Sequence, residues 1–589
     1  MCARLPSVLR RIARMAWQLD RVAVLLLIAC QLVTGVAAAV GLAAIAHAMQ
    51  SILGTGTVDD RLHEALPALL VVTVTTALGR LSSSLASYAD RRLTPLLTTY
   101  ADTALVEAVC RVESAANAKD GFADRQEAAG MGVLRTHVMV NDAQRFMAAL
   151  IRMIAASGVL SALHWAMLPL LILAVLPAGI GALLSARVDY EMHYANVCDR
   201  NVRHMMRWWA TTPKHGDEVR ANGMTGYLLF WYRSLSERID RRLLAVAPRT
   251  LRITLLSATT GGFFLLLTWA ALAWLAVTGR IELAIAATAV VAVQTTLGAL
   301  SQVVINGAAL FHTSLYLTDM QAFLDDAAQR APQRGVLPAP AKVEEIRFDN
   351  VVYQYPGKDL PAVDGVSLTL RRGEILAIVG ENGSGKSTLL RLITGIYLAD
   401  KGRILWNGRD LATVDQDTVW ARTGLVPQLF AQWPLCVREN VTLGQPRTHD
   451  DAPVWDAIDA VGMREAVDDL PHGLETLLAR EVFGGAELSG GQWQRLACSR
   501  AIYRRPELLI LDEPTSQMDA RGEHQIFEKI KGGACDRITV VVTHQLENTK
   551  VADRIAVMEH GRIIEVGRYD DLADAGGLFA DLLALAKDR

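Results

Sequence analysis

The sequence predicts an all-α membrane domain of six transmembrane helices, followed by a cytoplasmic α/β domain built around a phosphate-binding loop (P-loop). Three observations indicate this fold class. The part of the chain before Phe311 contains six apolar runs of about 20 residues or more, the length that crosses a bilayer. The composition changes to a soluble α/β pattern near Leu337. In that half, the glycine-rich segment Gly380–Thr388 follows a short apolar run.

The overall composition suits a chain that is only partly embedded in a membrane. The 589 residues exceed the size of one compact domain, and 51% of them are hydrophobic while 20% are charged. The formal net charge of −2 gives no reason to expect a nucleic-acid partner. Seven cysteines occur without any CxxC pair, so we expect neither a disulfide framework nor a zinc site.

The six apolar runs predict the transmembrane helices. We place these helices at Val22–Met49, Leu66–Tyr88, Phe146–Met167, Leu168–Val188, Ile253–Thr278 and Ile281–Phe311. The third and fourth are nearly continuous, so we expect them to form a tight hairpin that divides near Met167. A signal peptide is the competing interpretation of the first run. That run is about twice as long as a signal peptide's apolar region, and further spans follow it.

Basic residues set the expected orientation of the spans. Arginines precede the first run and recur in the two long connecting segments, for example Arg91, Arg125, Arg203 and Arg242. By the positive-inside rule both termini and both long segments are cytoplasmic. The first 20 or so residues read as an amphipathic helix on that face. The segments Ala115–Arg125 and Glu218–Tyr232 are our candidates for contacts with the cytoplasmic domain.

Three polar residues share one face of the sixth predicted span. Gln302 and Asn306 lie one turn apart, and Gln294 lies two turns before Gln302. Two interpretations stay open for them. They line a cavity that touches a substrate, or they form hydrogen bonds between helices, as polar residues in membranes commonly do.

A P-loop pattern lies in the second half of the chain. The apolar run Leu376–Val379 predicts a short buried strand, and Leu389–Thr394 predicts a helix after the loop. Glycines let backbone N–H groups converge on phosphates, and the helix N-terminus adds its positive end. Lys386 would reach the β- and γ-phosphates, and the Ser387 hydroxyl would bind Mg²⁺. The predicted phosphate-binding residues are Gly380, Glu381, Asn382, Gly383, Ser384, Gly385, Lys386, Ser387 and Thr388.

Two carboxylates follow another apolar run. Leu508–Leu511 predicts a strand that ends at Asp512 and Glu513. A parallel strand beside the phosphate loop would hold Asp512 near the Mg²⁺ and Glu513 beside the attacking water. Phosphoryl transfer needs charge neutralisation and an oriented nucleophile, and these two carboxylates supply both.

A second anion-binding motif precedes those carboxylates. Ser489, Gly490, Gly491 and Gln492 combine a serine and two glycines with the start of a helix. For a lone Ser-Gly-Gly the default interpretation is a plain helix cap. One nucleotide cannot readily occupy two such loops on the same subunit, so we expect two domains to face each other, each completing the other's site.

Together these motifs resemble the nucleotide-binding domain of ABC transporters. The resemblance implies roles for four more residues. Tyr355 matches the aromatic that stacks on adenine, and Gln428 matches the glutamine that links Mg²⁺ and the attacking water to the membrane domain. Asp519 matches the D-loop aspartate, and His544 matches the switch histidine on the γ-phosphate. The D-loop departs from the family pattern because Gln517-Met518 stands where Ala-Leu is usual, and this change bears on cross-talk between sites.

The resemblance covers the whole chain and implies an exporter-type half-transporter. It implies a transmembrane domain at 1–330 and a P-loop ATPase domain at 343–589. Catalysis of ATP hydrolysis with Mg²⁺ would rest on Glu513, His544 and Lys386, with Ser387, Gln428 and Asp512 at the metal. The presence of Glu513 argues against an ATP-gated channel or regulator, because gating needs only ATP binding.

The expected partners and setting also follow from the resemblance. The partner would be a second copy of the chain or a homologous half-transporter, in contact with lipid at the cell (inner) membrane. The expected cargo is hydrophobic or amphipathic, with a modified peptide as one candidate. The alternatives are a lipid or multidrug exporter, or an importer on the exporter fold.

Overall fold

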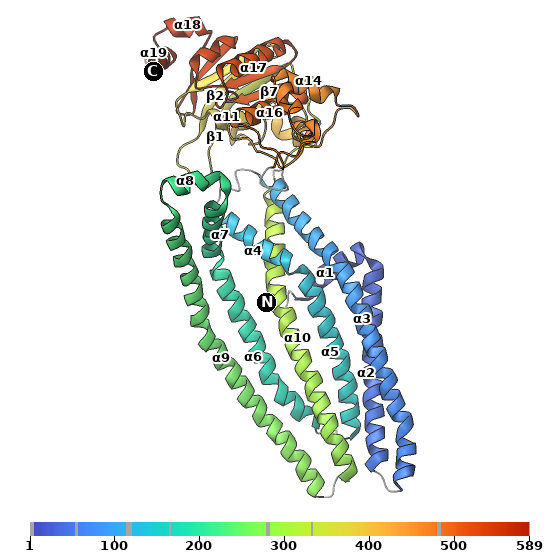
Figure 1. Ribbon diagram of the computed structural model, residues 1–589. Coiled ribbons are helices and arrows are strands. Elements are labelled where there is room, and N and C mark those ends of the chain that lie inside the picture. The colour runs from blue at the N-terminus through green and yellow to red at the C-terminus, as the bar shows by residue number, and fades with distance from the viewer. Residues whose placement is uncertain are drawn as a thin grey trace. The chain divides into compact units, whose positions relative to one another are not determined.

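The computed structural model describes residues 5–53, 57–113, 121–163, 167–278, 283–331, 334–479 and 485–587. The chain divides into two compact units, a helical unit that ends at Ala331 and an α/β unit that follows it. Figure 1 shows both, coloured along the chain. Each is described by itself.

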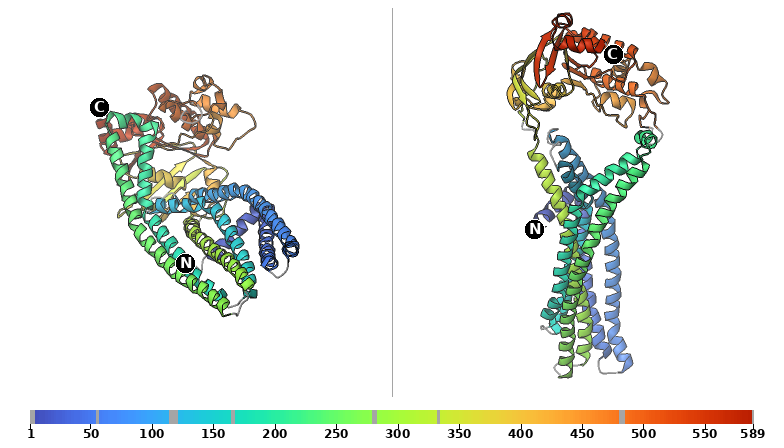
Figure 2. Two further views of the ribbon diagram at one scale, coloured as in Figure 1. Left: turned by 60° about the horizontal axis from the view of Figure 1, so that its bottom comes forward. Right: turned by 90° about the vertical axis from the view of Figure 1, so that its left-hand side faces the viewer.

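Long helices make up the first unit, and Figure 2 shows them running alongside one another. The predicted spans lie in α2, α3, α5, α6, α9 and α10. The helices of this unit are α1 (Leu5–Leu19), α2 (Arg21–Leu53), α3 (Val58–Arg111), α4 (Phe122–Leu134), α5 (Thr136–Leu163), α6 (Met167–Ala195), α7 (Val197–Thr211), η3 (Pro213–His215), α8 (Gly216–Ala221), α9 (Thr225–Val277) and α10 (Leu283–Gln329).

Four stretches among the described residues are long and apolar enough to cross a membrane. They are Arg21–Ile45, Asp59–Arg111, Pro169–Ala195 and Thr225–Val277. The third and sixth predicted spans fall in α5 and α10, and parts of these predictions lie outside the described residues, at 164–166 and 281–282. The helices α3 and α9 have 54 and 53 residues. At about 1.5 Å per residue, each is about 80 Å long and exceeds the hydrocarbon thickness of a bilayer.

The third and fourth predicted spans divide close to the expected position near Met167. The structure gives α5 to Leu163 and α6 from Met167, and residues 164–166 between them lie outside the described residues. The amphipathic helix predicted over the first 20 or so residues is confirmed as α1, which buries Ile12 and Ala16.

Close packing of small residues joins helices in this unit. The helices α6 and α9 run in contact, and a Cβ on Gly261 of α9 would lie 2.7 Å from the carbonyl oxygen of Ala174 in α6.

On α10, the Asn306 amide donates a 3.3 Å hydrogen bond to the Arg145 carbonyl of α5. That bond agrees with the inter-helix interpretation of Asn306, while the side chains of Gln294 and Gln302 are exposed.

The α/β unit contains two sheets. The smaller sheet has the order β2-β1-β4-β5 and the larger one the order β10-β9-β3-β8-β7-β6. In the larger sheet β9, β3, β8, β7 and β6 are parallel, and β10 is an antiparallel edge strand. The strands are β1 (Glu345–Tyr353), β2 (Val363–Arg371), β3 (Ile375–Gly380), β4 (Lys401–Trp406), β5 (Arg409–Asp410), β6 (Thr423–Val426), β7 (Leu508–Asp512), β8 (Ile538–Val542), β9 (Arg554–Glu559) and β10 (Arg562–Gly567).

Helices cover the larger sheet, and alternate strand residues feed two separate cores. On β7, Leu508 and Ile510 belong to one hydrophobic cluster while Leu509 and Leu511 belong to the other. This is the period-two pattern of a strand buried on both faces. The helices of eight or more residues are α11 (Lys386–Ile393), α14 (Ala452–Ala460), α16 (Gly490–Tyr503), α17 (Ala520–Gly532) and α19 (Leu578–Lys587).

The strand that carries Asp512 is parallel to β3, and Asp512 lies 3.5 Å from Ser387 of the phosphate loop, as expected. Between β3 and β7 lies β8, an order that the sequence interpretation did not address. Strand order is set by long-range pairing, which the local sequence does not encode.

Candidate nucleotide-binding site

The P-loop has the predicted strand–loop–helix form. The strand β3 ends at Gly380 and the helix α11 begins at Lys386. Gly385 has φ of 103°, and a Cβ there would lie 2.4 Å from the Ala362 carbonyl oxygen. A Cβ on Gly380 would lie 2.2 Å from the Met558 carbonyl oxygen. Glycine is required at both positions, because a side chain would push the loop off its neighbours.

Lys386 folds back onto its own loop. Its Nζ donates hydrogen bonds of 2.8 Å to the carbonyl oxygens of Gly380 and Glu381. Burial lowers the pKa of Lys386, and the nearby carboxylates of Asp512 and Glu513 oppose that shift. The Ser384 hydroxyl is also buried, without a hydrogen-bond partner among the described residues. A cation and an unpaired hydroxyl in one glycine-rich loop fit a phosphate ligand.

The three predicted metal ligands line one cavity. Ser387, Gln428 and Asp512 border a space of about 290 Å³. The Ser387 hydroxyl donates to Asp512 Oδ2 at 3.5 Å, across the gap between α11 and β7. Hydroxyl, amide and carboxylate oxygens are the donor set that Mg²⁺ prefers. Burial raises the pKa of Asp512, and the neighbouring charge of Glu513 raises it further.

Glu513 and His544 form a pair at the ends of two adjacent strands. The Glu513 Oε1 atom lies 2.9 Å from His544 Nε2. Glu513 has φ of 53°, a left-handed conformation that is uncommon outside glycine, and its N–H donates to the Val542 carbonyl at 2.9 Å. A strained backbone at a carboxylate is typical of functional sites.

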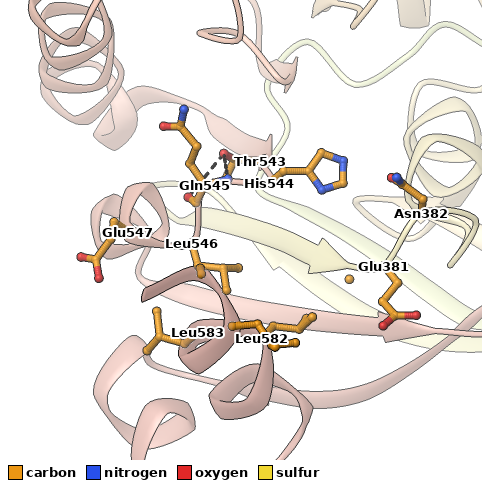
Figure 3. A pocket seen from close by; sticks show the side chains of 12 residues that line it. Glu381, Asn382, Thr543, His544, Gln545, Leu546, Glu547, Leu582 and Leu583 are labelled. Atoms are coloured by element: carbon orange, nitrogen blue, oxygen red, sulfur yellow. Dashed lines mark hydrogen bonds between the residues drawn. The ribbon is translucent and has the colours of Figure 1, made fainter. Parts of the chain in front are cut away.

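His544 also borders a larger cavity of about 970 Å³. Figure 3 shows His544 and the P-loop residues Glu381 and Asn382 around it, with Leu582 and Leu583 of α19 on another side. The beginning of the P-loop and the segment after β8 therefore face a common space.

Tyr355 forms hydrogen bonds with the helix α11 that follows the P-loop. Its hydroxyl lies 3.0 Å from Thr388 Oγ1, and Arg391 donates a 3.0 Å hydrogen bond to it. Its ring meets Tyr353 and Tyr397 edge to face. The sequence interpretation gave no role to Arg391 or Tyr397. A cationic or aromatic residue on a helix after a P-loop is too common to signal such a contact.

The Ser489 motif caps a helix. The Ser489 hydroxyl accepts from the Gln492 N–H at 3.3 Å, and the Ser489 N–H donates to Gln492 Oε1 at 2.9 Å. This is the capping box of α16. The two cavities beside the P-loop include none of the residues 489–492.

Asp519 caps the helix α17. Its carboxylate accepts from the Gly522 N–H at 3.1 Å and pairs with Arg495 at 2.8 Å. One segment from the sequence interpretation, Ala115–Arg125, lies partly outside the described residues.

Comparisons with known proteins agree with this fold. Residues 363–516 match the family model described as ABC transporter. The chain is 37% identical over 264 residues to an ATP-dependent lipid A-core flippase of Chromobacterium violaceum, an alignment that covers 45% of this chain and 44% of that protein. It is 31% identical over 264 residues to a subtilin transport ATP-binding protein of Bacillus subtilis, covering 45% and 43%. The matched region spans less than half the length of these curated relatives.

A solved structure extends the likeness to the whole fold. A bacterial Atm1-family ABC exporter with ATP bound superposes with a TM-score of 0.81 at 22% identity, covering 96% of this chain and 99% of that one. The predicted fold class is thus confirmed, and so is the resemblance to exporter-type half-transporters. The match to the ABC transporter model lies within the second unit, and apolar helices in the first unit indicate a multi-pass membrane protein.

Proposed function

We propose that this chain, which has the fold of an exporter-type ABC half-transporter, uses ATP hydrolysis to export a hydrophobic or amphipathic substrate. One observation supports this proposal above all. Ser387, Gln428 and Asp512 line a single cavity. Glu513, which pairs with His544, is the residue directly after Asp512. This arrangement holds oxygen ligands, a general base and a histidine within one phosphoryl-transfer site.

The proposed roles follow from the positions of the side chains. Lys386 binds the β- and γ-phosphates in place of its two loop carbonyls, and the P-loop N–H groups bind the remaining phosphate oxygens. Ser387, Gln428 and Asp512 would hold Mg²⁺, which when bound neutralises charge on the phosphates. Glu513 orients the attacking water and accepts its proton, and His544 fixes the Glu513 carboxylate at 2.9 Å.

A second subunit is part of the proposal. In the fold of the chain, the capped N-terminus of α16 offers Ser489, Gly490, Gly491 and Gln492 as a separate anion-binding surface. We propose that this surface completes the ATP site of a second copy, so that the working unit is a homodimer. A homologous half-transporter is the alternative partner.

The cargo is proposed at the level of chemical class. A modified peptide is favoured by the likeness to the subtilin transport protein. The likeness to the lipid A-core flippase supports the alternative of a lipid or multidrug exporter. Both similarities cover less than half of each relative, so a direct transport assay must decide between these classes. We place the protein in the cell (inner) membrane with both termini cytoplasmic, as the arginine distribution favours.

The test uses inside-out membrane vesicles that contain the full-length protein or the Glu513→Gln variant. MgATP is added outside with a fluorescent modified peptide, a fluorescent lipid or a hydrophobic dye. We expect ATP-dependent accumulation of one cargo class inside the vesicles, and none with Glu513→Gln. Accumulation in right-side-out vesicles loaded with ATP, and not in inverted ones, would instead support an importer.

A further inference from the structure

A buried glutamine that the mechanism does not use lies next to the catalytic carboxylate. Gln494 is on α16, five residues after Ser489, and it is 1% exposed. Its Nε2 donates to the Glu513 carbonyl oxygen at 2.9 Å and to the Ser516 hydroxyl at 3.1 Å. Its Oε1 accepts from the Gln517 N–H at 2.8 Å. A buried amide with both donors and its acceptor engaged is a fixed structural element.

All three partners of Gln494 belong to the short segment that follows β7. Glu513 carries the carboxylate, and Ser516 and Gln517 lie in the D-loop. The left-handed Glu513 backbone is held on one side by its N–H bond to Val542 and on the other by the Gln494 amide. A residue in a strained conformation persists only where its surroundings determine it. Gln494 therefore helps to set the direction of the Glu513 side chain.

The beginning of the same helix packs on the same loop. A Cβ on Gly490 would lie 2.9 Å from Gln517 Oε1, and a Cβ on Gly491 would lie 2.9 Å from the Gln517 carbonyl oxygen. The helix α16 thus touches the segment 513–517 twice, through its N-terminal glycines and through Gln494. A displacement of the α16 N-terminus must be accommodated by this segment, because closely packed groups transmit shifts.

We propose that Gln494 is a positioning residue that couples the two ATP sites of a dimer. The inference rests on the proposed function, in which the α16 N-terminus binds the ATP of the partner subunit while Glu513 acts on the ATP of its own. Engagement of one ATP fixes α16, and Gln494 passes that constraint to the carboxylate of the other site. Hydrolysis at the two sites is then interdependent.

The test compares full-length wild type, Gln494→Met and Gln494→Glu in nanodiscs. Gln494→Met keeps the side-chain length but cannot donate to the Glu513 carbonyl. We expect kcat to fall about tenfold to a hundredfold, as for a misplaced catalytic group. The Hill coefficient for ATP should fall from above 1 to about 1. ATP affinity, measured in the Glu513→Gln background, should change less than about threefold, because Gln494 contacts no nucleotide-binding atom.

Gln494→Glu adds a pH-dependent readout, and its melting temperature is recorded at each pH so that a loss of stability is told apart from a loss of positioning. A buried carboxyl has a raised pKa, and only its protonated form can donate to the Glu513 carbonyl. The activity of Gln494→Glu relative to wild type should therefore rise as the pH falls from about 8.5 to about 6, where the protonated fraction grows. A relative activity independent of pH would contradict the proposal.

Ser499→Ala is the matched control. Ser499 is fully buried on the same helix, and its hydroxyl donates only to the Leu496 carbonyl at 2.7 Å within that helix. This variant should lower the melting temperature without changing the Hill coefficient. An unchanged Hill coefficient in Gln494→Met, or a wild-type value of 1, would overturn the coupling while leaving ATP hydrolysis intact. A wild type that does not hydrolyse ATP would overturn the proposed function as well.

Discussion

Asp512 is an acid in surroundings that disfavour its charge. It is 8% exposed, and burial together with the adjacent Glu513 raises its pKa. Lys386 opposes this shift but is itself buried, and burial lowers its own pKa. Neither group has the solvent that would normally stabilise its charge. A cation bound among Ser387, Gln428 and Asp512 would favour the ionised carboxylate. Without that cation, the charged carboxylate of Asp512 lowers the stability of the folded protein.

The buried charge of Asp512 predicts that Asp512→Asn stabilises the nucleotide-free protein near neutral pH. Because the pKa of Asp512 in the folded protein is raised above the ordinary aspartate value of 3.8, folding favours the protonated form. The stability contributed by this group is fully present below that value and is lost as the pH rises through the folded pKa. Asn removes the loss, so we expect an apparent melting temperature higher by a few degrees, at about 2–4 °C per kcal/mol.

The measurement is thermal unfolding of the full-length protein without Mg²⁺ or nucleotide at pH 7.5 and pH 5. The gain from Asp512→Asn should be smaller at pH 5. The exposed Asp450 provides the control, and Asp450→Asn should leave the melting temperature unchanged at both pH values. A lower melting temperature for Asp512→Asn at pH 7.5 would show that its carboxylate stabilises the empty site.

At the scale of elements, adjacent glycines on α9 differ in what surrounds them. A Cβ on Gly261 would meet the Ala174 carbonyl oxygen of α6 at 2.7 Å, whereas a Cβ on Gly262 would meet nothing within 4 Å. Small residues allow helix backbones in membranes to approach closely. The contact between α6 and α9 therefore depends on Gly261 and not on Gly262.

Gly261→Ala should destabilise the helical unit by about 1–3 kcal/mol, the usual cost of overpacking. Gly262→Ala should be neutral or stabilise the unit by up to about 1 kcal/mol, because alanine is the better helix former. The check is the apparent melting temperature of each variant in nanodiscs, with helicity followed by circular dichroism. Equal effects of the two substitutions would contradict the close approach of α6 and α9.

The elements that the sequence predicted well are those with local signals. The strand predicted at Leu376–Val379 is β3, and the helix predicted at Leu389–Thr394 overlaps α11, because a glycine-rich loop separates two apolar segments. The position of β8 between β3 and β7 could not be predicted, since it depends on pairing between residues far apart in the chain.

For the site, too, the sequence predicted residues that belong to recognisable motifs and missed a contact that depends on the fold. The resemblance to ABC transporters implied that Ser387, Gln428 and Asp512 act together, and these three residues do line one cavity. Gln494 stood beside the Ser489 motif without an assigned role. Only the fold shows that this glutamine is buried against Glu513 and the D-loop. Burial of a single polar residue depends on tertiary packing, which periodicity along one helix does not reveal.

At the scale of the whole molecule, the proposed function requires more than one chain. In that proposal the P-loop, Asp512 and Glu513 form one half of an ATP site, and the capped N-terminus of α16 provides the other half to a partner. A helical unit with membrane-crossing stretches and a nucleotide-binding domain in one chain matches the exporter fold. The proposed function therefore requires that Glu513 is the catalytic base and that the active particle contains two copies.

One measurement tests both claims directly. Full-length wild type, Glu513→Gln and the exposed-site control Glu528→Gln are reconstituted in nanodiscs. ATP hydrolysis and particle mass are then recorded on the same samples. We predict Mg²⁺-dependent hydrolysis by a particle with two copies, a loss of at least about a hundredfold for Glu513→Gln with ATP binding retained, and normal activity for Glu528→Gln. Hydrolysis by Glu513→Gln at the wild-type rate, or by a particle with one copy, would contradict the account.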